Sequence, residues 1–273
     1  MKIGVGTFVT DEGIGSAKLA VALEERGFDA LFLAEHSHIP ASRQSPYPGG
    51  GELPRMYYRA VDPFVALAAA AAVTERLLLG TGVTLLIQRD VIHTAKEVAT
   101  LDLISGGRFV FGVGAGWNRE EMADHGTDPR TRGALLDEQL AALREIWTTD
   151  LAEFHGRFVD FDPMYAWPKP VQRPHPPIFI GGGPAAARRA ARLGAGWFPT
   201  AVASPAEVPA QLAQLEGADV PVMVAGVAAD PALLDAYAEA GVGRVSLMLP
   251  TLPESETLDM LDQFTKVAAR FTS

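Results

Sequence analysis

Short apolar segments of strand length alternate with longer, helix-length segments from one end of the chain to the other. The apolar segments consist mainly of Val, Ile, Leu, Phe, Ala and Gly, which is typical of a parallel sheet buried on both faces. We predict strands over residues 3–9, 30–34, 77–85, 109–113, 178–180, 196–200, 220–225 and 244–249. We predict helices over residues 16–26, 62–74, 93–104, 131–148, 185–193, 205–215, 231–240 and 255–271.

Eight strand–helix units favour a (β/α)8 TIM barrel over a doubly wound sheet. The chain has 273 residues, a length that suits one barrel domain over residues 1–273. Residues 37–61, after the second strand, and residues 150–177, before the fifth, interrupt the alternation as insertions. We interpret the first as a lid over the substrate, because it leaves a strand at the end where barrel active sites lie. The second is either a short hairpin that plugs one end of the barrel or a segment with a packing role only.

The composition narrows the functional classes. The chain has no cysteine, which excludes disulfides, thiol catalysis and cysteine-ligated metal centres. Its formal net charge of −10 argues against nucleic acid or an anionic membrane surface as a partner. No apolar run reaches the roughly 18 residues needed to span a bilayer, and no charged leader precedes the first strand. We therefore expect a cytoplasmic protein that acts on a small molecule.

Glycines gather in the third and fourth predicted strands. Gly80 and Gly82 interrupt the third strand, and Gly112, Gly114 and Gly116 end the fourth. Because side chains alternate across a strand, the last three would share one face and leave a bare backbone surface. Such a surface either binds the flat ring of a cofactor or packs tightly against a neighbouring strand at a barrel corner, and the spacing leaves both interpretations open.

A second glycine cluster, Gly181-Gly182-Gly183, lies between the fifth strand and its helix. Pro184 follows and suits the first helical position, where its missing N–H costs nothing. The glycines leave backbone amides free to point at an anion, and a helix N-terminus adds partial positive charge. The cluster therefore favours a phosphate site over an ordinary strand–helix turn.

Glu35, His36 and His38 follow the second strand, where barrel active sites lie. His36 can exchange a proton near neutral pH, and we interpret Glu35 as its neighbouring carboxylate. His36 and His38 also suggest a metal, but the other histidines do not follow predicted strands, so further ligands are missing. A structural role is the third alternative, and we predict no metal site.

Trp117 follows the fourth strand at the same end of the barrel, and it either stacks on a flat cofactor or substrate or belongs to the core. Asp102 of the third helix and Arg108 before the fourth strand are predicted to pair. Residues 13–18 and 112–117 imitate a dinucleotide fingerprint but lack its third glycine, which argues against a Rossmann site.

Several motifs together resemble the luciferase-like monooxygenase superfamily, and within it the branch of oxidoreductases that use the deazaflavin coenzyme F420. The motifs are Gly80-Thr81-Gly82-Val83, Ala99-Thr100-Leu101-Asp102, Ser105-Gly106-Gly107-Arg108, Gly112-Val113-Gly114-Ala115-Gly116-Trp117, Lys169-Pro170-Val171-Gln172 and Ile180-Gly181-Gly182-Gly183. Their order and spacing are similar to those of the superfamily through essentially the whole chain.

The resemblance implies a (β/α)8 barrel with the ring system of the cofactor at the C-terminal mouth. It implies a non-prolyl cis peptide bond at Gly82–Val83 against that ring and the cofactor phosphate near Gly181–Gly183. It also implies that Glu35 and His36 border the reacting carbon. Our candidate catalytic residues are therefore His36 and Glu35, and our candidate cofactor-binding residues are Gly82, Val83, Gly114, Trp117, Gly181, Gly182 and Gly183.

We expect an enzyme that transfers hydride between F420 and a small organic substrate, with His36 handling the accompanying proton. The main alternative is an FMN-dependent monooxygenase that uses reduced flavin and O2. A metal-dependent barrel hydrolase built on His36 and His38 and a non-catalytic cofactor-binding protein are the other two. Barrels of this superfamily often form dimers, so a homodimer is compatible with the resemblance. Neither the substrate, the direction of hydride transfer nor the oligomeric state follows from the sequence.

Overall fold

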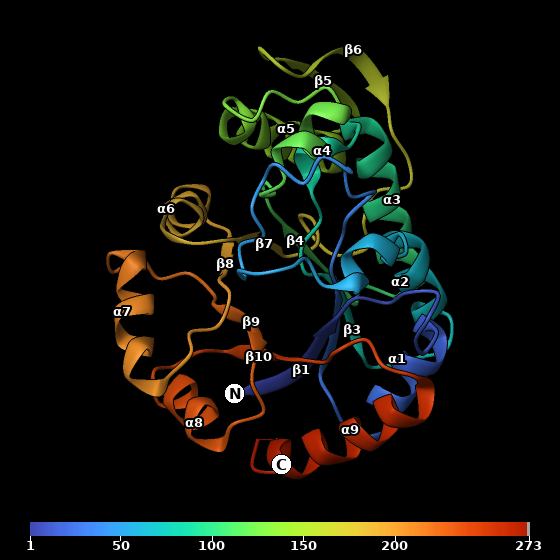
Figure 1. Ribbon diagram of the computed structural model, residues 1–273. Helices are drawn as coiled ribbons and strands as arrows, with labels where there is room; N and C mark the ends of the chain where they lie inside the picture. The colour runs from blue at the N-terminus through green and yellow to red at the C-terminus, as the bar shows by residue number, and fades with distance from the viewer. Residues whose placement is uncertain (272–273) are drawn as a thin grey trace.

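The computed structural model describes residues 1–271, in which eight parallel strands form one sheet in the order β8-β7-β4-β3-β2-β1-β10-β9. Bridges from Trp197 to Val222 and from Thr200 to Ala225 join β8 to β9 and close the sheet into a barrel. The predicted (β/α)8 barrel is confirmed (Figure 1). Its strands are β1 (Lys2–Thr7), β2 (Ala30–Leu33), β3 (Leu78–Thr81), β4 (Phe109–Val113), β7 (Ile178–Gly181), β8 (Gly196–Phe198), β9 (Met223–Val227) and β10 (Arg244–Met248).

Helices surround the barrel on its outside (Figure 1). The predicted sixth helix, residues 205–215, is divided into η3 (Pro205–Glu207), α7 (Val208–Leu212) and η4 (Ala213–Leu215). Pro209, which has no N–H, lies in the first turn of α7, where η3 ends. Within the described residues, no helix is long and apolar enough to cross a membrane. The other helices of the outer layer are α1 (Ser16–Glu25), α2 (Pro63–Ala71), α3 (Val91–Ile104), α5 (Arg132–Thr148), α6 (Pro184–Leu193), α8 (Pro231–Glu239) and α9 (Glu254–Ala268).

A cluster of large rings packs within the sheet. Phe32, Phe179 and Phe198 belong to one buried apolar cluster, and the rings of Phe32 and Phe198 meet at 5.2 Å. Glycines in the strands make room for these rings. A Cβ at Gly80 would lie 2.5 Å from the Phe32 ring, and one at Gly196 would lie 2.3 Å from the Phe179 ring. Several strand glycines therefore serve close packing.

The predicted bare glycine face on the fourth strand is wrong. A Cβ at Gly112 would lie 2.1 Å from the carbonyl oxygen of Thr81, so this glycine allows two strand backbones to approach each other. β4 ends at Val113, and Gly116 lies beyond it with a φ of 62°. The alternative interpretation, tight packing between strands, holds for Gly112.

The predicted third strand, residues 77–85, ends early. β3 stops at Thr81, the Gly82–Val83 bond is cis as the resemblance implies, and a short 3-10 helix, η2 (Leu86–Gln88), follows. The segment stays beside β4, because Thr84 N–H donates to the carbonyl oxygen of Gly112 at 2.8 Å. Side-chain contacts described below explain why the chain leaves the strand here.

The insertion before the fifth barrel strand contains the expected hairpin, formed by β5 (Leu151–His155) and β6 (Asp160–Tyr165). It does not plug the barrel. Figure 1 shows it outside the helix layer beside α5, and the Glu138 carboxylate of α5 accepts a hydrogen bond from Phe158 N–H at 2.7 Å. The packing role is the one that the structure supports.

The predicted pair between Asp102 and Arg108 does not form. Asp102 is fully buried in α3 and accepts hydrogen bonds from the backbone N–H of Gln172 at 2.9 Å and from its side-chain amide at 2.6 Å. Arg108 instead donates to carbonyl oxygens, among them those of Thr74 and Leu77. Both side chains have a structural role. Asp102 fixes the segment that contains Gln172, and Arg108 fixes the segment between α2 and β3.

Candidate active site

His36 lies three residues beyond β2, at the C-terminal end of the barrel strands. Its side chain is 5% exposed, and its Nδ1 forms a hydrogen bond of 2.7 Å with Oε2 of Glu121, whose side chain is fully buried. The Glu121 carboxylate also accepts a hydrogen bond from the backbone N–H of Ser37 at 3.1 Å. A carboxylate at one ring nitrogen fixes the orientation of an imidazole and leaves Nε2 for a reacting group.

Glu121 was not among the predicted site residues. It lies in α4 (Arg119–Asp124), a helix that was not predicted from the sequence. Asn118 caps this helix by accepting a hydrogen bond from Glu121 N–H at 3.4 Å. The spacing Asn118-x-x-Glu121 after the fourth strand is the pattern of a capped helix N-terminus. That signal predicts the helix, but the contact with His36 spans 85 positions in the chain.

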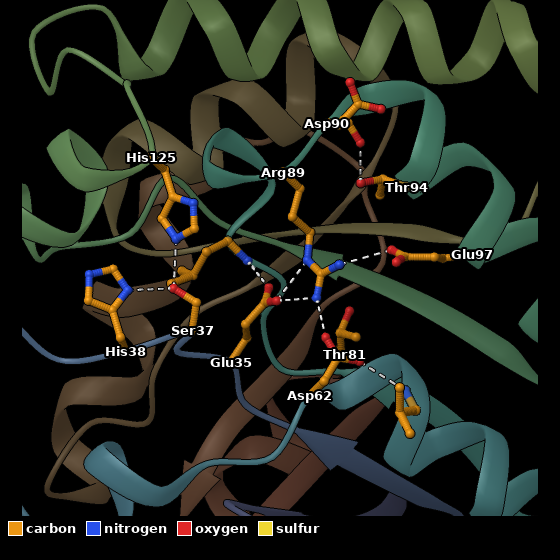
Figure 2. Close-up of polar contacts among 12 residues, drawn as sticks. Glu35, Ser37, His38, Asp62, Thr81, Arg89, Asp90, Thr94, Glu97 and His125 are labelled. Carbon is orange, nitrogen blue, oxygen red and sulfur yellow. Dashed lines mark hydrogen bonds and ion pairs between the residues drawn. The ribbon is translucent and has the colours of Figure 1, made fainter.

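Glu35 does not contact His36 through its carboxylate, contrary to our interpretation. Its Oε2 accepts a hydrogen bond from Leu85 N–H at 2.7 Å, and its Oε1 accepts one from Arg89 Nε at 2.7 Å. Figure 2 shows the Glu35 side chain directed at the Arg89 guanidinium. Glu35 therefore holds the segment that follows β3, and the carboxylate partner of His36 is Glu121.

Arg89 is the centre of a charge cluster in which Arg89 and Glu35 are mostly buried (Figure 2). Besides Glu35, it binds the carboxylates of Asp62 at 2.7 Å and Glu97 at 2.9 Å, and its guanidinium lies 4.7 Å from the centre of the Phe64 ring. Burial alone would lower the pKa of Arg89, but the three carboxylates outweigh it and hold that pKa above its ordinary value. The cluster ties the residues after β3 to α2 and α3.

Val83 packs against two of the predicted cofactor glycines. A Cβ at Gly114 would lie 2.7 Å from Val83 Cγ2, and a Cβ at Gly181 would lie 2.7 Å from Val83 Cγ1. Only glycine therefore fits beneath this side chain at either position. Gly82, Val83, Gly114 and Gly181 come together in one place, at the C-terminal ends of β3, β4 and β7.

The predicted phosphate loop precedes α6. Gly182 has a φ of 126°, which favours glycine, and Pro184 occupies the first turn of the helix as predicted. Gly183 is exposed, with no neighbouring atom within 4 Å of an added Cβ. The indole N–H of Trp197 donates to the carbonyl oxygen of Gly182 at 2.8 Å and fixes the loop from the barrel side.

Aromatic rings surround His36. The Trp117 ring meets the His36 ring edge to face at 5.8 Å, and the Tyr57 ring of the first insertion lies 5.2 Å from it. The Tyr57 hydroxyl is 3.4 Å from that of Tyr47, and burial is the main cause that raises the pKa of Tyr57, which keeps this phenol neutral. The segment predicted as a lid thus lies directly against the candidate acid–base residue.

His38 points to different partners from those of His36. Its Nε2 contacts Asp124 at 3.0 Å, and its Nδ1 lies 2.9 Å from the hydroxyl of Ser37, which also contacts His125 (Figure 2). Among residues 1–271, no group of three or more histidine, aspartate or glutamate side chains is arranged to hold a metal ion. The two histidines of the metal hypothesis do not share a ligand site.

Three buried polar atoms in the segments that end β3 and β4 have no hydrogen-bond partner within the described part of the chain. They are Thr84 Oγ1, Gln88 Nε2 and Asn118 Nδ2. Buried polar groups are rarely left without a partner in native proteins, so ordered water is the usual partner of such atoms.

Comparison with known proteins identifies the family of this chain and agrees with its fold. A model of the luciferase-like monooxygenase family matches residues 15–218. An uncharacterized protein of Mycobacterium tuberculosis is 41% identical over 261 residues, which is 92% of both chains. An F420-dependent glucose-6-phosphate dehydrogenase of Nakamurella multipartita is 34% identical over 195 residues, covering 69% of this chain and 52% of that protein. An FMNH(2)-dependent dimethylsulfone monooxygenase of Pseudomonas putida is 41% identical over 109 residues, covering 38% of this chain and 30% of that protein.

Solved structures share the fold at low sequence identity. The monooxygenase RslO1 from Streptomyces bottropensis aligns over 100% of both chains with a TM-score of 0.78 and 23% identity. An F420-dependent secondary alcohol dehydrogenase, solved with an F420–acetone adduct, aligns over 98% of this chain and 99% of that one with a TM-score of 0.73 and 18% identity.

Replacing Arg89 by Met should destabilise the fold, because it leaves the Glu35 carboxylate buried without its counter-charge. We expect a loss of about 3 kcal/mol in the free energy of unfolding, measured by urea denaturation. The double variant Arg89→Met/Glu35→Gln should recover part of that loss. Arg119→Met, at an exposed position, is the control and should change stability by less than about 0.5 kcal/mol. Equal stability of the first variant and the control would contradict the role assigned to the charge cluster.

Proposed function

We propose that this chain, which belongs to the luciferase-like monooxygenase family, transfers hydride between coenzyme F420 and a small organic substrate at the C-terminal mouth of its barrel. More broadly, it is a flavin- or deazaflavin-dependent oxidoreductase of that family. The observation that carries the finer proposal is the buried His36–Glu121 pair, which lies at the same end of the barrel as the candidate cofactor glycines.

The residues at the mouth suit a cofactor that has a flat ring system and a phosphate. Val83, fixed between Gly114 and Gly181, offers an apolar side chain on which a ring can pack. The open backbone at Gly183 and the N-terminus of α6 suit the phosphate.

His36 would exchange the proton that accompanies the hydride. When bound, the deazaflavin supplies or accepts the hydride, and this chain positions the substrate and moves the proton. Glu121 holds Nδ1 of His36, so Nε2 is the atom that gives a proton to a substrate oxygen or takes one from it. Glu35 is a positioning residue, since its carboxylate fixes Leu85 and Arg89 and through them the Val83 segment.

Two other functions remain as alternatives. An FMN-dependent monooxygenase would use the same ring and phosphate contacts, and the similarity to the dimethylsulfone monooxygenase favours it. F420 is our first choice because the F420-dependent relative matches 69% of this chain, against 38% for the FMN-dependent one. A non-catalytic cofactor-binding protein would not need an imidazole–carboxylate pair.

Cofactor choice is tested by titrating the metal-free protein with F420 and, separately, with FMN, and following the absorbance and fluorescence of each. We expect F420 to bind at least about tenfold more tightly than FMN, a difference of about 1.4 kcal/mol. Tight binding of FMN alone would move the assignment to the monooxygenase. Binding of neither would refute the proposed cofactor site.

Replacing Gly183 by Asp separates phosphate binding from helix stability. Asp is a favourable N-cap residue, so α6 should be as stable as before or more so. The new carboxylate should repel the cofactor phosphate and weaken F420 binding by about tenfold or more. Gly183→Ala is the matched control, because nothing lies within 4 Å of its added Cβ, and it should bind F420 normally. Unchanged F420 affinity in the Asp variant would place the phosphate elsewhere.

Catalysis by His36 is tested with the cofactor that the titration identifies and a panel of small alcohols and ketones. His36→Asn should lower kcat by about 100-fold, the usual range for loss of a general acid or base, while the cofactor Kd stays within about twofold. His93→Asn, exposed on α3, is the control and should keep full activity. Turnover retained in His36→Asn would refute the proton role. Turnover absent from the wild-type protein with every substrate would favour the non-catalytic alternative.

A further inference from the structure

The Tyr57 ring lies among four aromatic residues, which we call the aromatic box: Phe8, His36, Tyr47 and Trp117. The ring centres of these residues lie 4.5, 5.2, 5.3 and 6.5 Å, respectively, from that of Tyr57. They come from the loops after β1, β2 and β4 and from the first insertion. Tyr57 thus occupies the space beside the candidate acid–base residue.

Two arginines on the same short helix hold Tyr57 in place. Tyr57 lies in the middle of η1 (Arg55–Arg59), and Arg55 and Arg59 bind carboxylates in the loop between β1 and α1. Arg55 Nε donates to Glu12 at 2.7 Å, and Arg59 Nε donates to Asp11 at 2.7 Å. The hydrogen bond from Arg55 is the main reason why the pKa of Glu12 lies below its usual value. We call these two ion pairs the latch.

The ion pairs of the latch lie at the protein surface. The side chains of Arg55 and Glu12 are 71% and 40% exposed, and those of Arg59 and Asp11 are 34% and 61% exposed. Ion pairs at the surface contribute little to stability and are screened by salt. One end of the lid is fixed to the body of the barrel, because Thr10 and Ala60 form a backbone bridge. In the middle of the lid, Gly50 and Gly51 are exposed and have φ angles of 77° and 69°, a conformation that favours glycine.

A molecule that reaches His36 from the side of the lid has to take the place of the Tyr57 ring. The residues around Tyr57 therefore indicate the shape and polarity of that molecule. Phe8 and Trp117 favour a flat ring, and the Tyr47 hydroxyl offers a hydrogen bond to one polar substituent. Aromatic boxes also attract cations, but the carboxylate that contacts this box, Glu121, is fully buried and already hydrogen-bonded to His36 and Ser37, so it offers no counter-charge to a cationic ligand.

We propose that Tyr57 is an intramolecular stand-in for the substrate, which is a flat, uncharged ring compound carrying one hydroxyl or carbonyl group. The substrate displaces Tyr57 from the aromatic box when the latch opens. Only the chemical reaction of the bound substrate rests on the proposed function. The aromatic box and the latch consist of residues of this chain and need no cofactor to form.

The test is whether a phenol can replace the missing ring in Tyr57→Ala. Phenol and cyclohexanol are matched uncharged probes that differ in flatness, and their binding is measured by calorimetry without any cofactor. We expect phenol to bind Tyr57→Ala at least about fivefold more tightly than wild type, which is the range of one aromatic contact. Cyclohexanol should bind this variant several-fold more weakly than phenol. Tyr57→Phe keeps the ring and should behave like wild type.

A second variant tests the latch without removing Tyr57. Arg55→Gln/Arg59→Gln should bind phenol more tightly than wild type and more weakly than Tyr57→Ala. Added salt should strengthen phenol binding to wild type but not to Tyr57→Ala, because salt screens the latch pairs. Equal phenol affinity in wild type, Tyr57→Ala and the latch variant would overturn the proposal. Tighter binding of cyclohexanol or of benzylammonium than of phenol would overturn the flat or the uncharged character of the substrate.

These outcomes are independent of the cofactor titration. If F420 binds but phenol shows no preference for Tyr57→Ala, the proposed function stands and the stand-in is refuted. If phenol behaves as expected but neither F420 nor FMN binds, the aromatic box stands as a ligand site and the proposed F420-dependent function is refuted.

Discussion

The Glu35 carboxylate determines how the chain leaves β3, and the geometry of the mouth follows from it. By accepting hydrogen bonds from Leu85 and Arg89, it draws the chain out of the strand after Thr81. A buried carboxylate needs both a counter-charge and hydrogen bonds to offset its loss of hydration, and Arg89 and Leu85 supply them. The Val83 side chain then lies over Gly114 and Gly181, which joins three strand ends into one surface.

The barrel could be predicted from the sequence because its signals are local. Strand-length apolar runs, helix-length segments and proline at a helix start, such as Pro184 of α6, depend on neighbouring residues only. The errors lie where distant contacts override the local pattern. The run 77–85 is apolar enough for a strand, yet a carboxylate some 50 positions away ends it at Thr81. Strand glycines were ambiguous for the same reason, since only the facing residue shows whether Gly112 adjoins a ligand or a backbone.

The position of the candidate site could be predicted from the sequence, but the hydrogen-bond partners of its residues could not. His36 was found because polar residues after a barrel strand lie at the functional end. Glu35 was assigned to it by adjacency, but consecutive residues of an extended chain point to opposite sides, so Glu35 and His36 face different groups. The true partner, Glu121, lies on a six-residue helix that amphipathic periodicity cannot reveal. The Asn118-x-x-Glu121 spacing marks the helix start, but no local rule states which distant side chain that glutamate meets.

The two groups of ion pairs at the site differ in their exposure to solvent. The side chains of Arg89 and Glu35 are mostly buried. Breaking this ion pair would leave an unpaired charge in an apolar environment, which is costly. Arg55 and Arg59 on the lid form pairs of the same chemical type in the solvent, where water replaces the partner at little cost. In our proposal, the buried pair therefore keeps the Val83 segment in place, whereas the surface pairs let a ligand displace Tyr57. A barrel enzyme needs both, because the reacting groups must be held in register while the substrate enters and leaves.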